Sequence, residues 1–281
     1  MIIIFKTGYQ WFIKYRRAVI FFVVVSIIFE IIQHLLNLKF GIGDNLRFFS
    51  FTAKDRLSDI LFLITAVCET WLGLGLIRHI YEGEMRQHAG YSAFTPLEIS
   101  PAIGGAAAVP FGQGGFLTGF TGETFARLPS GVIAVVILTI IVQMPGELFL
   151  YLNQTASAIL SPTVILALVL MVVGILFVLR FCLVMEAIVV DSIKCPFEAL
   201  RASYRATKNR LFKIFAVILF PVILMEICFG MLMKGSNSGS LVDAALGAVW
   251  ILRGLFSAFM VCVSLRLYLV LKTEKSENIK S

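Results

Sequence analysis

Six long apolar runs, separated by shorter polar segments, dominate the hydropathy pattern of the chain. A helix needs about 20 mostly apolar residues to cross the hydrocarbon core of a bilayer, and every run is close to that length or longer. The pattern predicts membrane-spanning helices over residues 18–36, 57–81, 131–152, 163–190, 211–233 and 245–271. We therefore expect an all-α fold: a polytopic bundle of six transmembrane helices, forming a single integral membrane domain over residues 1–281.

The first 17 residues have a different pattern, in which aromatic residues alternate with polar ones. Phe5, Tyr9, Trp11 and Phe12 suit the membrane–water interface, where amphipathic helices lie in the plane of the bilayer. The basic residues of this segment follow its short apolar start instead of preceding it. We expect an amphipathic N-terminal segment and not a cleavable signal peptide.

The stretch 97–120 is weakly apolar and rich in glycine and proline. It is long enough to span, but a seventh crossing would place the six basic residues between Lys194 and Lys213 on the outer side. A re-entrant or interfacial element keeps the number of crossings even, provided that protein or a wet cavity shelters its non-helical backbone. A plain cytoplasmic loop is the alternative.

The composition restricts the class of protein. Hydrophobic residues make up 59% of the chain and charged residues 15%, against roughly 45–50% and about 25% in a soluble domain; the mean hydropathy is +0.92. These values exclude a soluble enzyme, a disordered protein and a nucleic-acid-binding module. The net charge of +7 is then a topology signal and does not indicate a nucleic-acid partner.

The distribution of Lys and Arg predicts the orientation. With the N-terminus in the cytoplasm, cytoplasmic segments carry 15 of the 24 basic residues, outer loops carry 5, and the rest lie in the spans. Cytoplasmic loops of membrane proteins are enriched in Lys and Arg. We expect a multi-pass protein of a bacterial inner (plasma) membrane, with both termini cytoplasmic.

Charged residues inside the spans are the candidate functional residues, because each costs about 2.5–3.5 kcal/mol at the centre of a helix. Glu147, Glu226 and Arg253 have similar outer depths, so we expect them to meet. The full set of candidate intramembrane polar residues is Glu30, Glu69, Glu147, Arg180, Glu186, Glu226, Arg253 and Arg266. Two interpretations stay open: a polar path for a proton, an ion or a lipid headgroup, or interhelical pairs that fix helix orientation.

The segment 191–213 predicts a basic amphipathic helix over residues 196–210. Asp191 or Ser192 is suited to cap it, and Pro196 lies in its first turn. Its aromatic residues share one stripe, and Arg201, Arg205 and Lys208 occupy the adjoining face. These three cations are candidate contacts to anionic phospholipids at the inner interface. The alternative is a simple positively charged anchor between two spans.

This region also resembles a known family. Arg180-Phe-Cys-Leu, Ala187-Ile-Val-Val, Pro196-Phe-Glu-Ala-Leu, Ser203 and Ala206-Thr-Lys are similar to a pattern of the YciC-type bacterial inner-membrane family. The same pattern resembles the membrane domain attached to some glycerophosphoryl diester phosphodiesterases. The resemblance covers the C-terminal half. It implies a six-helix inner-membrane fold without a settled activity, and no phosphodiesterase chemistry, since the catalytic barrel is missing from the sequence.

Sequence motifs of enzymes and of cofactor or metal sites are missing. The three His residues have no H-E-x-x-H spacing, no G-x-S-x-G elbow occurs, and the five Cys residues form no C-x-x-C pair. We expect a non-enzymatic envelope or lipid-interacting protein whose partners are the lipid bilayer, anionic phospholipids and a membrane protein or a second copy. The alternative is a small secondary transporter or channel-like protein, with a broken-helix element at 97–120.

Overall fold

The computed structural model describes residues 1–40, 53–91, 120, 122–155, 162–235 and 239–280, and within these ranges every regular element is a helix. The helices are α1 (Ile2–Lys14), α2 (Arg16–Phe40), α3 (Ala53–Tyr91), α4 (Glu123–Thr155), α5 (Pro162–Phe181), α6 (Val184–Val190), α7 (Pro196–Thr207), α8 (Leu211–Ile214), a π-helical turn (Phe215–Leu219), α9 (Phe220–Gly235) and α10 (Gly239–Lys280).

Five helical segments are long and apolar enough to cross a membrane. They are Leu63–Met85, Glu123–Ile141, Leu168–Val190, Leu211–Met231 and Gly247–Glu274. The expected run 18–36 lies within α2, but the side chains of α2 beyond Ile32 are described only at Leu35. The all-helical architecture is therefore confirmed, with five helical segments that could cross a membrane, while the count of six spans stays a prediction.

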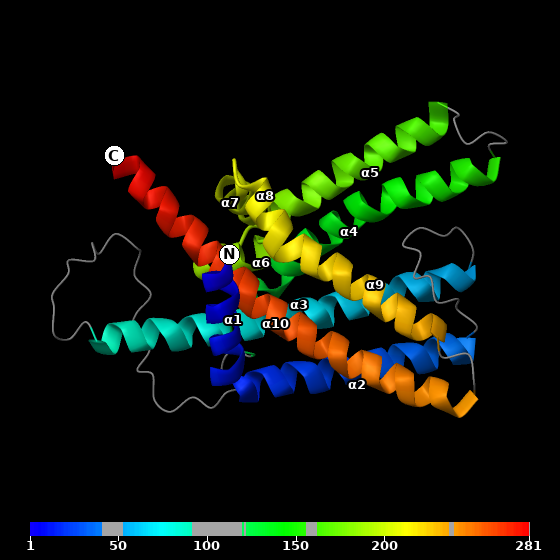
Figure 1. Ribbon diagram of the computed structural model, residues 1–281, viewed down its shortest axis with the longest axis horizontal. Coiled ribbons are helices and arrows are strands. Elements are labelled where there is room, and N and C mark those ends of the chain that lie inside the picture. The colour runs from blue at the N-terminus through cyan, green and yellow to red at the C-terminus, as the bar shows by residue number, and fades with distance from the viewer. Residues whose placement is uncertain (41–52, 92–119, 121, 156–161, 236–238, 281) are drawn as a thin grey trace.

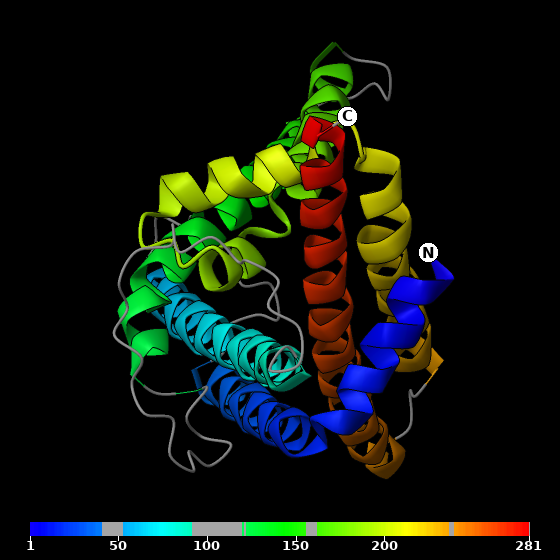
Figure 2. The same ribbon diagram turned by 90° about the vertical axis from the view of Figure 1, so that its left-hand side faces the viewer.

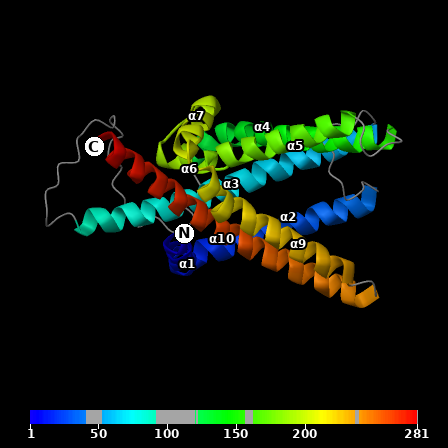
Figure 3. The same ribbon diagram turned by 45° about the horizontal axis from the view of Figure 1, so that its top comes forward.

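The long helices lie side by side in an elongated bundle (Figure 1). α2 approaches α3, α4 approaches α5, and α9 approaches α10 at one end of the bundle, which we call the hairpin end (Figure 3). The other end carries α1, α6, α7 and α8, and we call it the α7 end. Both α1 and α7 run across the direction of the long helices there (Figure 2). This is the orientation of helices that lie in the plane of a membrane interface.

The predicted amphipathic N-terminal segment forms α1, which packs across α10. Ile4 and Trp11 are buried in this contact, and Phe12 meets Phe259 edge-to-face at 6.0 Å. A side chain at Gly8 would come within 2.8 Å of Val263 Cγ2, so only glycine permits this approach. The opposite face of α1 leaves Ile2 83% exposed.

The expected span 163–190 is not one continuous helix. It breaks at Cys182–Leu183, where Leu183 takes φ −100° and ψ 19° and separates α5 from α6. The apolar run gives no sign of this break, because apolar residues continue on both sides of it. The break frees carbonyls at the end of α5, and α7 binds one of them, as described below.

Two further expectations about the amphipathic helix were wrong. α7 ends at Thr207 and not at residue 210, because Asn209 takes a positive φ of 65°, which ends a helix. Its N-cap is Cys195, without a side-chain cap, so neither Asp191 nor Ser192 caps it. Asp191 instead accepts hydrogen bonds from Tyr268 and Lys272 of α10.

The π-helical turn lies directly before Pro221. Proline has no N–H to donate to the carbonyl four residues earlier, and its ring collides with that carbonyl in a regular α-helix. A wider turn over Phe215–Leu219 moves this carbonyl aside. The chain can therefore continue from α8 into α9 without a break.

Phe120 fills the space between α2 and α3. It is 1% exposed, its ring lies 4.9 Å from that of Phe21, and Trp71 Nε1 donates a 2.9 Å hydrogen bond to its carbonyl. Gly75 leaves the room that this ring occupies. Of the Gly-rich stretch 97–120, this is the one residue that the structure describes, so the predicted re-entrant element lies outside the described residues.

Candidate functional site

The end of α5 and the buried face of α7 are joined by hydrogen bonds around Arg180. The carbonyl of Arg180, freed by the break after α5, accepts bonds from Ser203 Oγ at 3.1 Å and Thr207 Oγ1 at 3.0 Å. The guanidinium Nη1 of Arg180 donates to the Thr207 carbonyl at 3.1 Å. A cation thus lies at the C-terminus of α7, where the helix dipole favours positive charge.

α7 has a small, buried face and a large, exposed one. Ala199, Ser203 and Thr207 recur every fourth residue and are 0% exposed, so the helix axis approaches the protein closely. The basic residues expected on the outer face are there, and Arg201, Arg205 and Lys208 are all exposed. No acid of the described chain forms an ion pair with them. Their charge is therefore available to a ligand.

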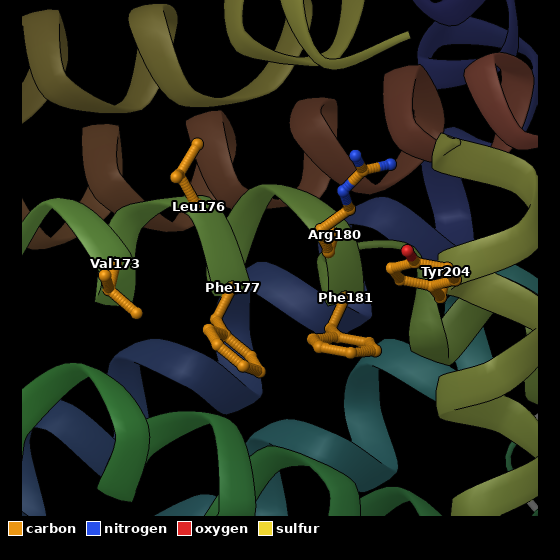
Figure 4. Close-up of a pocket in the computed structure, with 6 residues that line it drawn as sticks. All are labelled: Val173, Leu176, Phe177, Arg180, Phe181 and Tyr204. Carbon is orange, nitrogen blue, oxygen red and sulfur yellow. The ribbon is translucent and has the colours of Figure 1, made fainter. Parts of the chain in front are cut away.

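A cavity of about 200 Å³ lies in the angle between α5 and α7 (Figure 4). Its lining residues are Val173, Leu176, Phe177, Arg180, Phe181 and Tyr204. The rings of Phe177 and Phe181 lie side by side with centroids 5.8 Å apart. Arg180 and Tyr204 stand together at one end of the cavity, and Val173 stands at the other (Figure 4).

Arg180 and Tyr204 lie together at one end of this cavity, whose surface is formed by apolar atoms only. The guanidinium carbon lies 5.1 Å from the centroid of the Tyr204 ring, within the range of a cation–π contact. The guanidinium is bound to the Thr207 carbonyl and points away from the rings of Phe177 and Phe181 (Figure 4). The apolar surface of the cavity matches part of an acyl chain, and the cations close to it match a phosphate.

The second group of charges lies toward the hairpin end. Arg253 Nη2 of α10 donates to Glu226 Oε1 of α9 at 2.8 Å, as expected from their depth. Glu69 of α3 interacts electrostatically with both Arg253 and Glu30 of α2. The side chain of Glu147, expected in the same group, lies outside the described part of the chain. Four helices therefore bring charges together here.

The remaining candidates lie at the α7 end and do not pair with one another. Glu186 of α6 is 3% exposed and accepts a hydrogen bond from Ser264 of α10. Arg266 of α10 places its guanidinium 5.9 Å from the Trp11 ring of α1. Arg180, expected at the same depth, binds α7 instead.

Ion pairs and hydrogen bonds, within helices and between them, are numerous at the α7 end, and those between helices could not be predicted from the sequence. Arg127 of α4 bonds to the carbonyl of Val189 at 3.1 Å, at the end of α6, and to Glu123 at 3.2 Å. Further pairs join Lys14 to Glu84, Arg78 to Glu82 and Glu123, Lys272 to Asp191, and Arg210 and Lys213 to Glu274. These charges flank the apolar runs, which gives their depth but not their partners.

Tyr15, at the turn between α1 and α2, belongs to this network. Its hydroxyl donates to Glu84 Oε1 at 2.9 Å. Burial, reinforced by the hydrogen bond to the Glu84 carboxylate and by its charge, raises the pKa of Tyr15. The phenol thus stays protonated and acts as a fixed donor that ties α1 to α3.

Metal coordination and relatives give no further indication of a function. Among the described residues, no group of three or more His, Cys, Asp and Glu side chains is arranged to hold a metal ion. The comparisons with known proteins leave the site to be interpreted from its own geometry: no family model, no curated protein and no solved structure matches the chain.

Proposed function

We propose that this chain is a multi-pass protein of a bacterial inner membrane, with six spans and both termini in the cytoplasm. Three observations support this topology. The helices α2 and α3, α4 and α5, and α9 and α10 form antiparallel pairs that meet at the hairpin end (Figure 1). The α7 end carries most of the charged residues, and the Lys and Arg residues are concentrated in the segments placed in the cytoplasm.

The proposed function is to bind an anionic phospholipid at the cavity between α5 and α7, in a role that is not enzymatic. The observation that carries this proposal is an apolar cavity that lies next to Arg180 and to the exposed cations of α7. The cavity is smaller than the roughly 300–1,000 Å³ of ordinary small-molecule pockets. It therefore accommodates part of one acyl chain beside Phe177, while the rest of the lipid stays in the bilayer.

The exposed cations of α7 increase the affinity for anionic headgroups. A Lys or Arg at the surface of an anionic membrane contributes about 1 kcal/mol, so Arg201, Arg205 and Lys208 together contribute about 3 kcal/mol. This corresponds to a factor of about 100 in the binding constant, since about 1.4 kcal/mol is tenfold. A neutral headgroup gains little of this free energy, because it has no net negative charge to attract the three cations.

We also propose membership of the YciC-type family. The contacts within the resembling pattern support this proposal, because its separate parts meet in space. Ser203, which follows the Pro196-Phe-Glu-Ala-Leu segment, donates to the carbonyl of Arg180. The pattern therefore has a physical basis: it joins a broken span to an interfacial helix.

Lipid retention measured by native mass spectrometry tests the function. The purified protein is exchanged into mixed phosphatidylglycerol and phosphatidylcholine, and the lipids that stay bound are counted. The variant Arg201→Gln/Arg205→Gln/Lys208→Gln is expected to lose most of its preference for phosphatidylglycerol. The matched control is Lys6→Gln/Arg16→Gln/Arg17→Gln, which removes three exposed cations near the N-terminus and is expected to keep it. Equal losses in both variants would contradict a site at α7 and favour general attraction to the membrane.

The charges of α2, α3, α9 and α10 favour a second candidate function, a proton-coupled or ion-coupled transporter. At about 1.5 Å per residue, Glu226 and Arg253 lie about 20 Å from Lys213 and Arg266. If Lys213 and Arg266 mark the membrane interface, Glu226 and Arg253 are therefore well inside the hydrocarbon core. Proteoliposomes that carry the protein and a pH-sensitive dye test this function: a proton flux abolished by Glu69→Gln would support transport. Equal dye signals from protein-containing and empty vesicles would contradict it.

A further inference from the structure

The buried carboxyl group of Glu186 has too few hydrogen-bond donors for a charged group. Its Oε1 lies against Ser264 Oγ, and its Oε2 has no hydrogen-bond partner among the described residues. The residue is 3% exposed, and the other buried residues of α6, Val184 and Ala187 to Val190, are apolar. A carboxylate in such surroundings needs a cation or several donors, because an unpaired buried charge costs several kcal/mol.

The hydroxyl group of Ser264 has two oxygen neighbours but only one hydrogen atom to donate. Its Oγ is within hydrogen-bond distance of two oxygens, Glu186 Oε1 and the Val261 carbonyl, the latter at 3.1 Å. A hydroxyl group has one hydrogen, and sharing it between two acceptors makes two weak hydrogen bonds. If Glu186 were ionised, Ser264 would have to share its hydrogen in this way, and the carboxylate would have no full hydrogen bond.

A proton on Glu186 satisfies both contacts. Glu186 Oε1 then donates its O–H to Ser264 Oγ, and Ser264 donates its own hydrogen to the carbonyl of Val261. The remaining oxygen of Glu186 becomes the carbonyl oxygen of a neutral acid. Leaving that oxygen without a donor costs about 1–3 kcal/mol, much less than an unpaired charge.

The charged and titratable groups of the surrounding helices do not neutralise Glu186. Two titratable groups interact with it electrostatically, Cys182 before α6 and Tyr268 of α10, and neither carries a positive charge. No cation of the described chain forms an ion pair with it. The cations of the packed helices whose side chains are described are bound elsewhere or exposed: Arg127 to Val189 and Glu123, Arg78 to Glu82 and Glu123, Lys272 to Asp191, Arg253 to Glu226, and Arg266 over Trp11, while Arg201 and Arg205 of α7 are exposed.

We infer that Glu186 is a proton-binding site of this protein, a neutral carboxylic acid whose hydrogen joins α6 to α10 through Ser264. The bound ligand is a single proton. Its removal would leave a buried negative charge beside Cys182 and would break one of the two hydrogen bonds of Ser264. The packing of α6 on α10, and with it the position of the adjoining α7, therefore depends on this proton.

Infrared spectroscopy of the whole protein in detergent tests the inference. A protonated carboxyl group absorbs at a C=O stretching frequency separate from that of carboxylates. We expect Glu186→Gln to remove one component of this band, while the control Glu226→Gln, whose carboxylate is paired with Arg253, leaves that component in place. A loss of carboxylate absorption in Glu186→Gln, with the protonated band unchanged, would overturn the inference.

Ser264→Ala gives a second measurement with Glu186 in place, should Glu186→Gln fail to fold. Without its acceptor, the O–H of Glu186 forms no hydrogen bond, so the same component is expected to shift to higher frequency. If Glu186 were a carboxylate that accepts from Ser264, the protonated band would not move, and the proposal would fail.

Thermal unfolding at several pH values supplies an independent readout. The unfolded chain releases the Glu186 proton above about pH 4.3, whereas the folded chain retains it. The stability of the wild type relative to Glu186→Gln is therefore greatest at acid pH and falls as pH rises, by up to tenfold in the unfolding equilibrium per pH unit. A constant or rising difference would contradict the proton-binding site.

Discussion

The two ends of the bundle are held together differently. At the α7 end, ion pairs and hydrogen bonds join α1 to α3, α4 to α6, α5 to α7 and α6 to α10. Toward the hairpin end, Glu226 and Arg253 form an ion pair, and the faces of α5 and α9 are apolar and exposed. Polar contacts thus gather where water and headgroups are near, and van der Waals packing dominates where lipid tails are the solvent.

The long helices also differ in how much of each is buried inside the protein. Of the segment Gly247–Glu274 in α10, 56% is buried, whereas the figure for Leu211–Met231 is 17%. α3 and α10 are the central helices, and α9 packs mainly on α10 and the π-helical turn. The peripheral helices therefore depend on the polar contacts of the α7 end for their positions.

Removing Arg127 is expected to have the largest effect on stability. Arg127→Met would leave the carbonyls at the end of α6 and the charge of Glu123 less well compensated, at a cost of about 2–3 kcal/mol. The counterpart toward the hairpin end is Arg253→Met, whose pair is about half exposed (47% and 54%). We expect it to cost less than about 1 kcal/mol. Thermal unfolding in one detergent compares the two, and a larger loss from Arg253→Met would reverse our comparison of the ends.

The next effect concerns the contact between α5 and α7. Ser203→Ala combined with Thr207→Val removes both hydroxyl donors to the Arg180 carbonyl, at about 1 kcal/mol for each hydrogen bond. Hydrogen–deuterium exchange is expected to increase in α7 and to stay unchanged in α1. Unchanged exchange in α7 would show that these hydrogen bonds do not hold the helix.

A smaller effect is expected where α1 crosses α10. Gly8→Ala forces the new methyl group against Val263, and overpacking of this kind costs about 1–2 kcal/mol. Val263→Ala makes room for the methyl group, so the double variant is expected to recover part of the loss. If the two losses simply add, the steric explanation is wrong.

The smallest expected effect is the pH dependence that Tyr15 contributes. The folded chain keeps the phenol protonated beside Glu84, whereas the unfolded chain ionises it above about pH 10. Stability is therefore full below pH 10 and falls as pH rises further. Between pH 9 and 11 the melting temperature of the wild type should fall more than that of Tyr15→Phe. Equal slopes would show that Tyr15 contributes nothing.

The sequence predicts the helices well because hydrophobic periodicity and length are local properties. The apolar runs place α3, α4, α5, α9 and α10, and the N-terminal segment is helical as expected. The break at Cys182–Leu183 could not be predicted, since it is stabilised by Ser203 and Thr207, more than 20 residues away.

Those parts of the candidate site that depend on local sequence patterns were predicted. Amphipathicity places Arg201, Arg205 and Lys208 on the exposed face of α7, and helical depth brings Glu226 to Arg253. The cavity depends on the angle between α5 and α7, which no local pattern contains. Asp191 shows the limit of local patterns. Asp is a residue type that commonly caps helices, but the partners of Asp191 are Tyr268 and Lys272 on a helix far along the chain.

A tryptophan placed in the cavity tests the lipid site most directly. Phe177→Trp, compared with the exposed Ile223→Trp on α9 as control, is reconstituted with brominated phosphatidylglycerol or brominated phosphatidylcholine, and the wild-type signal is subtracted. Our account predicts that the anionic lipid quenches the tryptophan at position 177 several-fold more strongly than the neutral lipid, with no preference at position 223. Equal quenching by both lipids at position 177 would contradict it.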